Sequence, residues 1–182
     1  MDASLGTELP QRGVYVWGGL GIALVMLLPT VRAFRRAAGE QEQVALAWAV
    51  SSVMALVLVV VPALTAWVFA RKHVFVSEEA VTVTAGDRVK HQHRFDDVTE
   101  VRVLVDGGLG SITPEFWNQA VAVRGPDQDG KVRWTKVSRT FVTTLEPLLR
   151  RLSEEVGRRP ELIRSDEERE LLQEYLAGTA GE

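Results

Sequence analysis

The sequence predicts a membrane-inserted α-helical hairpin followed by an α+β soluble domain of six to seven antiparallel strands closed by a C-terminal helix. Three observations predict this fold class. Two uncharged apolar stretches fill most of residues 13–70, short runs with a period of two follow them, and helical spacing of leucines returns near the C-terminus. Of the 182 residues, those after the second stretch are enough for one small domain with its own core.

The two apolar stretches are long enough to cross a bilayer. They cover residues 13–31 and 44–70. About 20 apolar residues in a helix span the ~30 Å hydrocarbon core, and a single charge inside it costs several kcal/mol. Trp48 and Trp67, about 28 Å apart along a helix, suit the two interfaces. The connection 32–43 is short, so we expect antiparallel neighbouring helices with tilt or a bend near Pro62.

The first apolar stretch differs from a cleaved signal sequence. Its leader, residues 1–12, is a tail without a basic cluster, and the arginine-rich flank after it is a poor cleavage site. Glycines in this helix predict a close approach between the helices, although glycine is also common in membrane helices. These small residues are Gly18, Gly19, Gly21 and Ala23.

Positive charge predicts the orientation of the hairpin. The connection carries three arginines, whereas the terminal side carries five cationic residues. Lys and Arg are enriched in the cytoplasmic segments of membrane proteins. The five are Arg12, Arg71, Lys72, Arg88 and Lys90. We therefore expect an integral protein of the bacterial inner membrane with both termini and the soluble domain cytoplasmic.

Alternating β-branched residues predict the strands of the domain at 71–157. The expected strands are residues 73–77, 80–84, 88–95, 98–105, 119–124 and 131–137. A helix then follows, capped by Thr143 or Thr144, with Pro147 in its first turn and Gly157 as C-cap. Its apolar face comprises Leu145, Leu148, Leu149, Leu152 and Val156. A second helix begins after Ser165, ends at Gly178 and belongs to a C-terminal segment 158–182.

Three segments resemble the bacterial pleckstrin-homology-like (PH-like) domain, as found in small membrane proteins with two helices ahead of it. They are HVFVSEEAVTVT, RFDDVTEVRV and FVTTLEPLLRRLSEEV, within residues 72–157. The resemblance implies an antiparallel β-barrel or sandwich closed by a helix. It also implies a non-catalytic binding or assembly module without a cofactor.

Composition excludes several classes of function. The chain has no cysteine, which excludes disulfides and thiolate sites. Residues 71–182 carry 17 Lys and Arg against 20 Asp and Glu, which is not the charge of a nucleic-acid-binding protein. His91 and His93 alternate on a strand and could hold a metal with Asp96 or Asp97, but two solvated histidines explain the pattern equally simply, and we predict no metal site.

Two further groups are candidate binding residues. Cations interleaved with Trp134 could recognise lipid headgroups, unless Val132 and Trp134 face the core and the cations face solvent. These cations are Lys131, Arg133, Lys136 and Arg139, with Arg71 and Lys72 at the membrane boundary. Apolar residues of the 106–118 loop could contact a partner, pack on their own domain or dip toward the bilayer. They are Leu109, Ile112, Phe116 and Trp117.

These observations leave three hypotheses. The first is a membrane-anchored, non-catalytic scaffold, an accessory subunit of a bacterial envelope assembly that contacts the lipid bilayer and a membrane-protein partner or a second copy. The second is a module that senses lipid headgroups through the Lys131–Arg139 strand. The third is a small membrane enzyme or metal site centred on His91 and His93.

Overall fold

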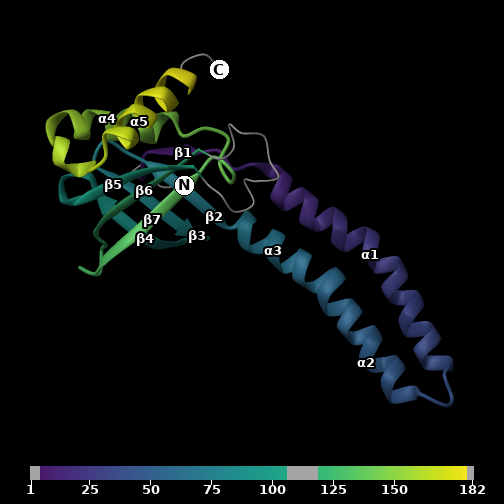
Figure 1. Cartoon of the computed structure of the whole chain (residues 1–182). Helices are drawn as coiled ribbons and strands as arrows, with labels where there is room; N and C mark the ends of the chain where they lie inside the picture. Colours follow the sequence, from purple (N-terminus) through teal and green to yellow (C-terminus); the bar gives the residue numbers. More distant parts are fainter. Residues whose placement is uncertain (1–4, 106–118, 180–182) are drawn as a thin grey trace. The chain divides into compact units, whose positions relative to one another are not determined.

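The helices and strands of the chain form two units (Figure 1). The computed structural model describes residues 5–105 and 119–179. One unit is Gly13–Arg71, and the other combines Met1–Arg12 with Lys72–Glu182. We call them the helical unit and the β unit.

The helical unit contains two helices that are long and apolar enough to cross a membrane. The first, α1, spans Gly13–Gly39. The second runs without interruption through α2 (Val44–Ala55), a π-helical turn (Leu56–Val60) and α3 (Val61–Ala70). The prediction of helix over 44–70 is confirmed. The prediction that the first helix ends at residue 31 is wrong, because the arginine- and alanine-rich segment after it continues the helix to Gly39.

The π-helical turn lies directly before Pro62. Proline has no N–H to donate, and its ring collides with the carbonyl four residues earlier in a regular helix. A widened turn is one of the known ways to accommodate this conflict, and here Val61 donates to the carbonyl of Leu56. The irregularity therefore falls where the sequence predicts tilt or a bend.

Aromatic contacts establish that the two long helices are antiparallel neighbours. The rings of Tyr15 and Phe69 lie 5.7 Å apart, and those of Phe34 and Trp48 lie 5.5 Å apart. Each pair joins one end of α1 to the opposite end of the second helix. The expected antiparallel arrangement is confirmed.

Gly19 is the residue that permits close packing in the helical unit. A Cβ atom on Gly19 would lie 2.9 Å from the carbonyl oxygen of Pro62 and 3.0 Å from Cβ of Ala66. A Cβ on Gly18 or Gly21 would meet nothing within 4 Å. The predicted close approach is thus confirmed at Gly19 but does not involve the other two glycines.

The β unit contains two antiparallel sheets with strand orders β1-β2-β3-β4 and β5-β6-β7. The first sheet comprises β1 (Thr7–Leu9), β2 (Lys72–Val76), β3 (Ala80–Ala85) and β4 (Arg88–Arg94). The second comprises β5 (Glu100–Val105), β6 (Gln119–Pro126) and β7 (Val132–Ser138). All six predicted strands are present as β2–β7, and the α+β class is confirmed. The structure does not show closure into a barrel.

Strand β1 comes from the residues expected to form a tail. It pairs with β2 in antiparallel register, with Thr7 opposite Val76 and Leu9 opposite Val74. Leu9 is completely buried in the core of the β unit. Backbone hydrogen bonds continue this attachment to the segment before α4, namely Thr143 N–H to Pro10 O (2.8 Å) and Arg12 N–H to Phe141 O (2.8 Å). Both ends of the helical unit are therefore joined to paired strands of one sheet.

Two helices complete the β unit and pack against each other, α4 (Glu146–Arg158) and α5 (Asp166–Thr179) (Figure 1). The predicted apolar face of α4 is confirmed, because its three leucines and the preceding N-cap residue Leu145 are buried in the core. The prediction of a C-cap at Gly157 is wrong. The helix continues to Arg158, and the carboxylate of Glu155 accepts hydrogen bonds from Arg158 and Arg159 across its last turn.

The turn Phe95–Asp97 joins the two sheets and receives the end of α4. Phe95 is buried, and the guanidinium of Arg159 donates to the backbone carbonyls of Phe95, Asp96 and Val98. One side chain thereby satisfies three carbonyls that the short 3-10 turn leaves without ladder partners.

Candidate functional site

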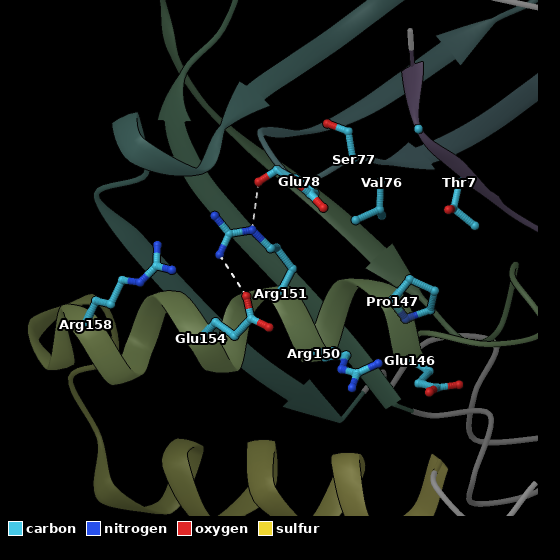
Figure 2. Close-up of a pocket in the computed structure, with 11 residues that line it drawn as sticks. Thr7, Val76, Ser77, Glu78, Glu146, Pro147, Arg150, Arg151, Glu154 and Arg158 are labelled. Carbon is cyan, nitrogen blue, oxygen red and sulfur yellow. Dashed lines mark hydrogen bonds and ion pairs between the residues drawn. The ribbon is translucent and has the colours of Figure 1, made fainter. Parts of the chain in front are cut away.

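A groove of about 940 Å³ lies between α4 and the β1–β2 end of the first sheet (Figure 2). Gly6 and Thr7 line it from β1, Val76 and the following turn line it from β2, and one face of α4 closes it. Gly6 has φ +92, and a Cβ there would overlap the Val76–Ser77 backbone, lying 2.6 Å from Cα and 2.7 Å from N of Ser77, so only glycine fits.

Charges of both signs line this groove. Figure 2 shows Arg151 reaching from α4 to the turn after β2, where its Nε donates to the carbonyl of Glu78 at 2.7 Å. The same guanidinium pairs with Glu154 at 3.2 Å and with the buried Glu155 at 2.6 Å. Burial alone would raise the pKa of Glu155, but its arginine partners lower it. Arg151 thus fastens the helix to the sheet, and the groove has no excess of one charge.

His91 and His93 face the β6–β7 hairpin, not solvent. They lie on the same side of β4, as their spacing predicts, but His93 is completely buried, which contradicts the expectation of two solvated histidines. Nδ1 of His93 lies 3.2 Å from the carbonyl of Pro126, and Nε2 lies 2.8 Å from the hydroxyl of Thr135. A carbonyl only accepts, so the neutral ring carries its proton on Nδ1. Burial lowers the pKa of His93 and keeps it neutral.

The carboxylate beside these histidines is Asp127. Its side chain is fully buried and accepts hydrogen bonds from the backbone N–H of Gln92 (2.8 Å) and Gln128 (2.8 Å). Its second oxygen contacts Nδ1 of His91 at 3.0 Å and Nη1 of Arg133 at 3.2 Å. Burial would raise the pKa of Asp127, but these donors lower it to about 2. The carboxylate therefore fastens β4 to the β6–β7 hairpin.

The described residues of this cluster are not arranged as a metal site. Asp96 and Asp97, the predicted third ligands, belong to the turn after β4, whereas the histidines point to Asp127 and Thr135. Among residues 5–105 and 119–179, no group of three or more His, Asp or Glu side chains is arranged to hold a metal. The side chains of His93 and Asp127 are buried, and their polar atoms bind neighbouring groups of β4 and the β6–β7 hairpin.

The predicted cations are spread along the whole length of β7. Lys131 precedes β7 and Arg139 follows it, about 26 Å apart at 3.3 Å per residue. Arg133 is paired with Asp127 and, at 3.8 Å, with Asp129. Arg139 is buried and donates to Gln119 at 3.1 Å. The structure therefore does not bring the four cations together at one point.

Two cations expected at the membrane boundary contact aromatic rings, each within its own unit. The guanidinium of Arg71 lies 4.9 Å from the centre of the Trp67 ring in the helical unit. The ammonium of Lys72 lies 5.9 Å from the Phe141 ring in the β unit.

The remaining predicted cation, Lys136, lies exposed on β7.

Trp134 faces solvent, which overturns the expectation that it and Val132 face the core. Trp134 is 42% exposed and Val132 is 56% exposed, whereas Thr135 and Val137 on the opposite side of β7 are buried. The predicted partner-binding residues Leu109, Ile112, Phe116 and Trp117 lie outside the described residues. Sequence reasoning missed the exposed Trp134 surface because an alternating strand does not reveal which of its two faces is buried.

Comparison with known protein families, curated proteins and solved structures gives no match for this chain.

Proposed function

We propose that this chain is a membrane-anchored, non-catalytic binding module. In this proposal a PH-like β unit is held at the cytoplasmic face of a bacterial cell membrane by a two-helix hairpin and serves as an accessory subunit of an envelope assembly. The observation that carries the proposal is the position of the hairpin within the chain, between the paired strands β1 and β2.

Strand pairing on both sides of the hairpin supports membrane anchoring without secretion. Residues before α1 and after α3 contribute to one hydrogen-bonded ladder, in which Leu9 is opposite Val74. Cleavage after α1 would separate β1 from its sheet, which argues against a removed signal sequence. A folded β unit also requires both ends of the hairpin on the same side of the membrane, as an even number of crossings provides.

The surface of the two long helices supports their insertion. In the most apolar 18-residue segment of the first helix, 11% is buried. In the corresponding segment of the second helix, 6% is buried. A core helix of a soluble protein has most of its apolar side chains buried, whereas here Trp17 is 74% exposed and Leu24 72% exposed. Apolar surface of this extent in water is an aggregation liability, and lipid removes it.

The order of elements supports a PH-like binding module. From β2 onward, consecutive antiparallel strands are followed by the amphipathic helix α4, which is the order implied by the resemblance. The histidine and aspartate side chains that could serve catalysis instead join β4 to the β6–β7 hairpin. This supports binding over catalysis. The headgroup-sensing alternative has less support, because its cations are dispersed along β7.

Two measurements on the full chain test the proposal. The chain lacks cysteine, so Gln41→Cys in the helix connection and Ser165→Cys in the β unit can be labelled separately with a membrane-impermeant maleimide. In intact cells we expect Gln41→Cys to react and Ser165→Cys to react only after the cells are opened. Labelling of Ser165→Cys in intact cells would contradict the cytoplasmic location.

The second measurement tests the role as an accessory subunit. Chemical cross-linking in native membranes, followed by purification in mild detergent, should yield one membrane protein in stoichiometric amount. If the chain is recovered alone, or only with lipid, the accessory-subunit role is wrong.

A further inference from the structure

The outer side of the β5–β7 sheet carries an exposed tryptophan surrounded by arginines. Trp134 on β7 lies opposite Arg124 on β6, and Arg124 lies opposite Glu100 on β5. The guanidinium of Arg102 is 5.6 Å and that of Arg124 is 5.8 Å from the centre of the Trp134 ring, within cation–π range. We call this surface the Trp134 face. It consists of Glu100, Arg102, Arg124, Val132, Trp134 and Arg164.

A single buried carboxylate holds the arginines of the Trp134 face in place. The side chain of Glu100 is only 5% exposed and contacts Arg102 at 3.1 Å, Arg124 at 3.3 Å and Arg164 at 3.5 Å. Burial would raise the pKa of Glu100, but hydrogen bonds from Arg102 and Arg124 lower it, so this carboxylate is ionised at neutral pH. Three guanidinium groups share one negative charge, and the side chains of all three remain 44–74% exposed.

The charge and composition of the Trp134 face differ from those of the rest of the β unit. Residues 71–182 carry more acidic than basic side chains, yet this face has three arginines against one glutamate. Within the described part of the β unit, the exposed large apolar residues are Val105, Val132 and Trp134, and two of these lie on this face. Tryptophan and arginine are the residue types most enriched at the energetic centres of protein interfaces.

We infer that the Trp134 face binds an acidic segment of a partner protein. Clustered Asp or Glu side chains of that segment would accept paired hydrogen bonds from the arginines that Glu100 positions, and an apolar side chain between them would pack on Trp134 and Val132. This inference rests on the proposed function, since it assigns the surface through which the accessory subunit meets its partner.

Distance along β7 separates the Trp134 face from the residue that leads into α1. Arg12, the last residue before α1, is held by the carbonyl of Arg139 at 2.7 Å. Trp134 lies five residues before Arg139 and so about 16 Å from it along β7. The Trp134 face is therefore well removed from the part of the β unit through which the chain enters the hairpin.

A photo-crosslinking amino acid at Val132 in the full chain, in native membranes, tests the inference. Val132 is exposed beside Trp134 and leaves the tryptophan and arginines intact. We expect adducts that map to an Asp- and Glu-rich segment of the partner. Trp134→Ala should lower their yield about tenfold or more. Arg124→Gln should lower it several-fold, because Glu100 keeps two other arginines.

Two controls separate this surface from the rest of the chain. Arg88→Gln, the same charge change on the other sheet, should leave the yield unchanged, and a crosslinker at the exposed Lys90 should give no adduct with the acidic segment. Circular dichroism verifies that each variant is folded. Adducts to lipid, to a second copy of this chain or to a segment without clustered carboxylates would overturn the inference, as would yields insensitive to Trp134→Ala.

The failure of this inference is distinguishable from that of the proposed function. If chemical cross-linking captures a stoichiometric partner but Val132 gives no adduct with it, only the Trp134 face is wrong. If no partner is captured by either method, the accessory-subunit role is wrong and the inference falls with it.

Discussion

Replacing Asp127 by asparagine tests the physical account of the buried cluster between β4 and the β6–β7 hairpin. The donors around this carboxylate lower its pKa from 3.8 to about 2. At 1.36 kcal/mol per pKa unit, the ionised form is stabilised by about 2 kcal/mol in the folded state. Asparagine retains an oxygen for Gln92 and Gln128 but loses the charge that faces His91 and Arg133. We therefore expect Asp127→Asn to lower the free energy of unfolding by about 2 kcal/mol at pH 7.

The pH dependence gives the sign of this effect. A carboxyl group whose pKa is lowered by folding stabilises the fold above its unfolded pKa, and this contribution is lost as the pH falls from about 4 toward 2. Pulse proteolysis of the full chain in mild detergent measures the difference in the free energy of unfolding between Asp127→Asn and wild type at pH 7 and pH 3. The difference should shrink at pH 3.

Asp129→Asn is the matched control for this prediction. The side chain of Asp129 is 59% exposed and its contact with Arg133 is 3.8 Å, so this variant should cost less than about 1 kcal/mol. Equal effects of the two substitutions, or a difference that does not vary with pH, would mean that the buried charge of Asp127 does not stabilise the fold.

Three further predictions concern the rest of the fold. Leu9→Ala should destabilise the β unit by about 2–4 kcal/mol in the same proteolysis assay, because this leucine is completely buried; no effect would mean that β1 is dispensable. Gly19→Leu should destabilise the helical unit by about 1–3 kcal/mol through overpacking, and should therefore lower the SDS concentration that unfolds the helices. Gly18→Leu should leave that concentration unchanged. Glu155→Gln should cost about 2–3 kcal/mol at neutral pH by thermal unfolding, because Arg151 and two other arginines lose a buried partner; an unchanged melting temperature would contradict this.

Hydropathy located the two long helices but not the end of the first. The prediction stopped at residue 31 because three arginines follow, yet arginine and alanine are strong helix formers and the helix continues to Gly39. The absence of charge defines what can lie in lipid, whereas helix propensity defines where the helix ends. The sequence pattern was sufficient for the first question only.

Strand β1 illustrates what local pattern cannot predict. Three residues, Thr7–Leu9, are too few for a recognisable alternation. Their partner strand lies beyond the whole hairpin, so the information that makes them a strand is tertiary. Most of the six longer strands carried enough β-branched residues to be predicted in place, and the polar β4 was predicted after the break at Gly86 and Asp87.

The face of β7 was also undetermined by sequence. Assigning Trp134 to the core because it is large and apolar inverted the strand, since the inner side includes Thr135, which contacts His93, and Val137. The buried polar contact between Thr135 and His93 places that side of β7 inside the β unit. The pairing of Asp127 with His91, 36 residues earlier in the chain, likewise had no local signal.

The hairpin is inserted between two paired strands of one domain, and a cross-strand disulfide is the sharpest test of this insertion. Thr7 and Val76 are opposite each other, so Thr7→Cys/Val76→Cys is within bridging distance, whereas Thr7→Cys/Val81→Cys places the second cysteine one strand further away. A protease site placed after Gly39, in the connection between the helices, then provides the readout in native membranes.

After mild oxidation and cleavage at that site, the two fragments of the Thr7→Cys/Val76→Cys variant should run together on a denaturing gel until a reductant is added. The Thr7→Cys/Val81→Cys variant should separate at once. Separation of both variants without reductant would show that β1 does not pair with β2 and would contradict the insertion of the hairpin into the domain.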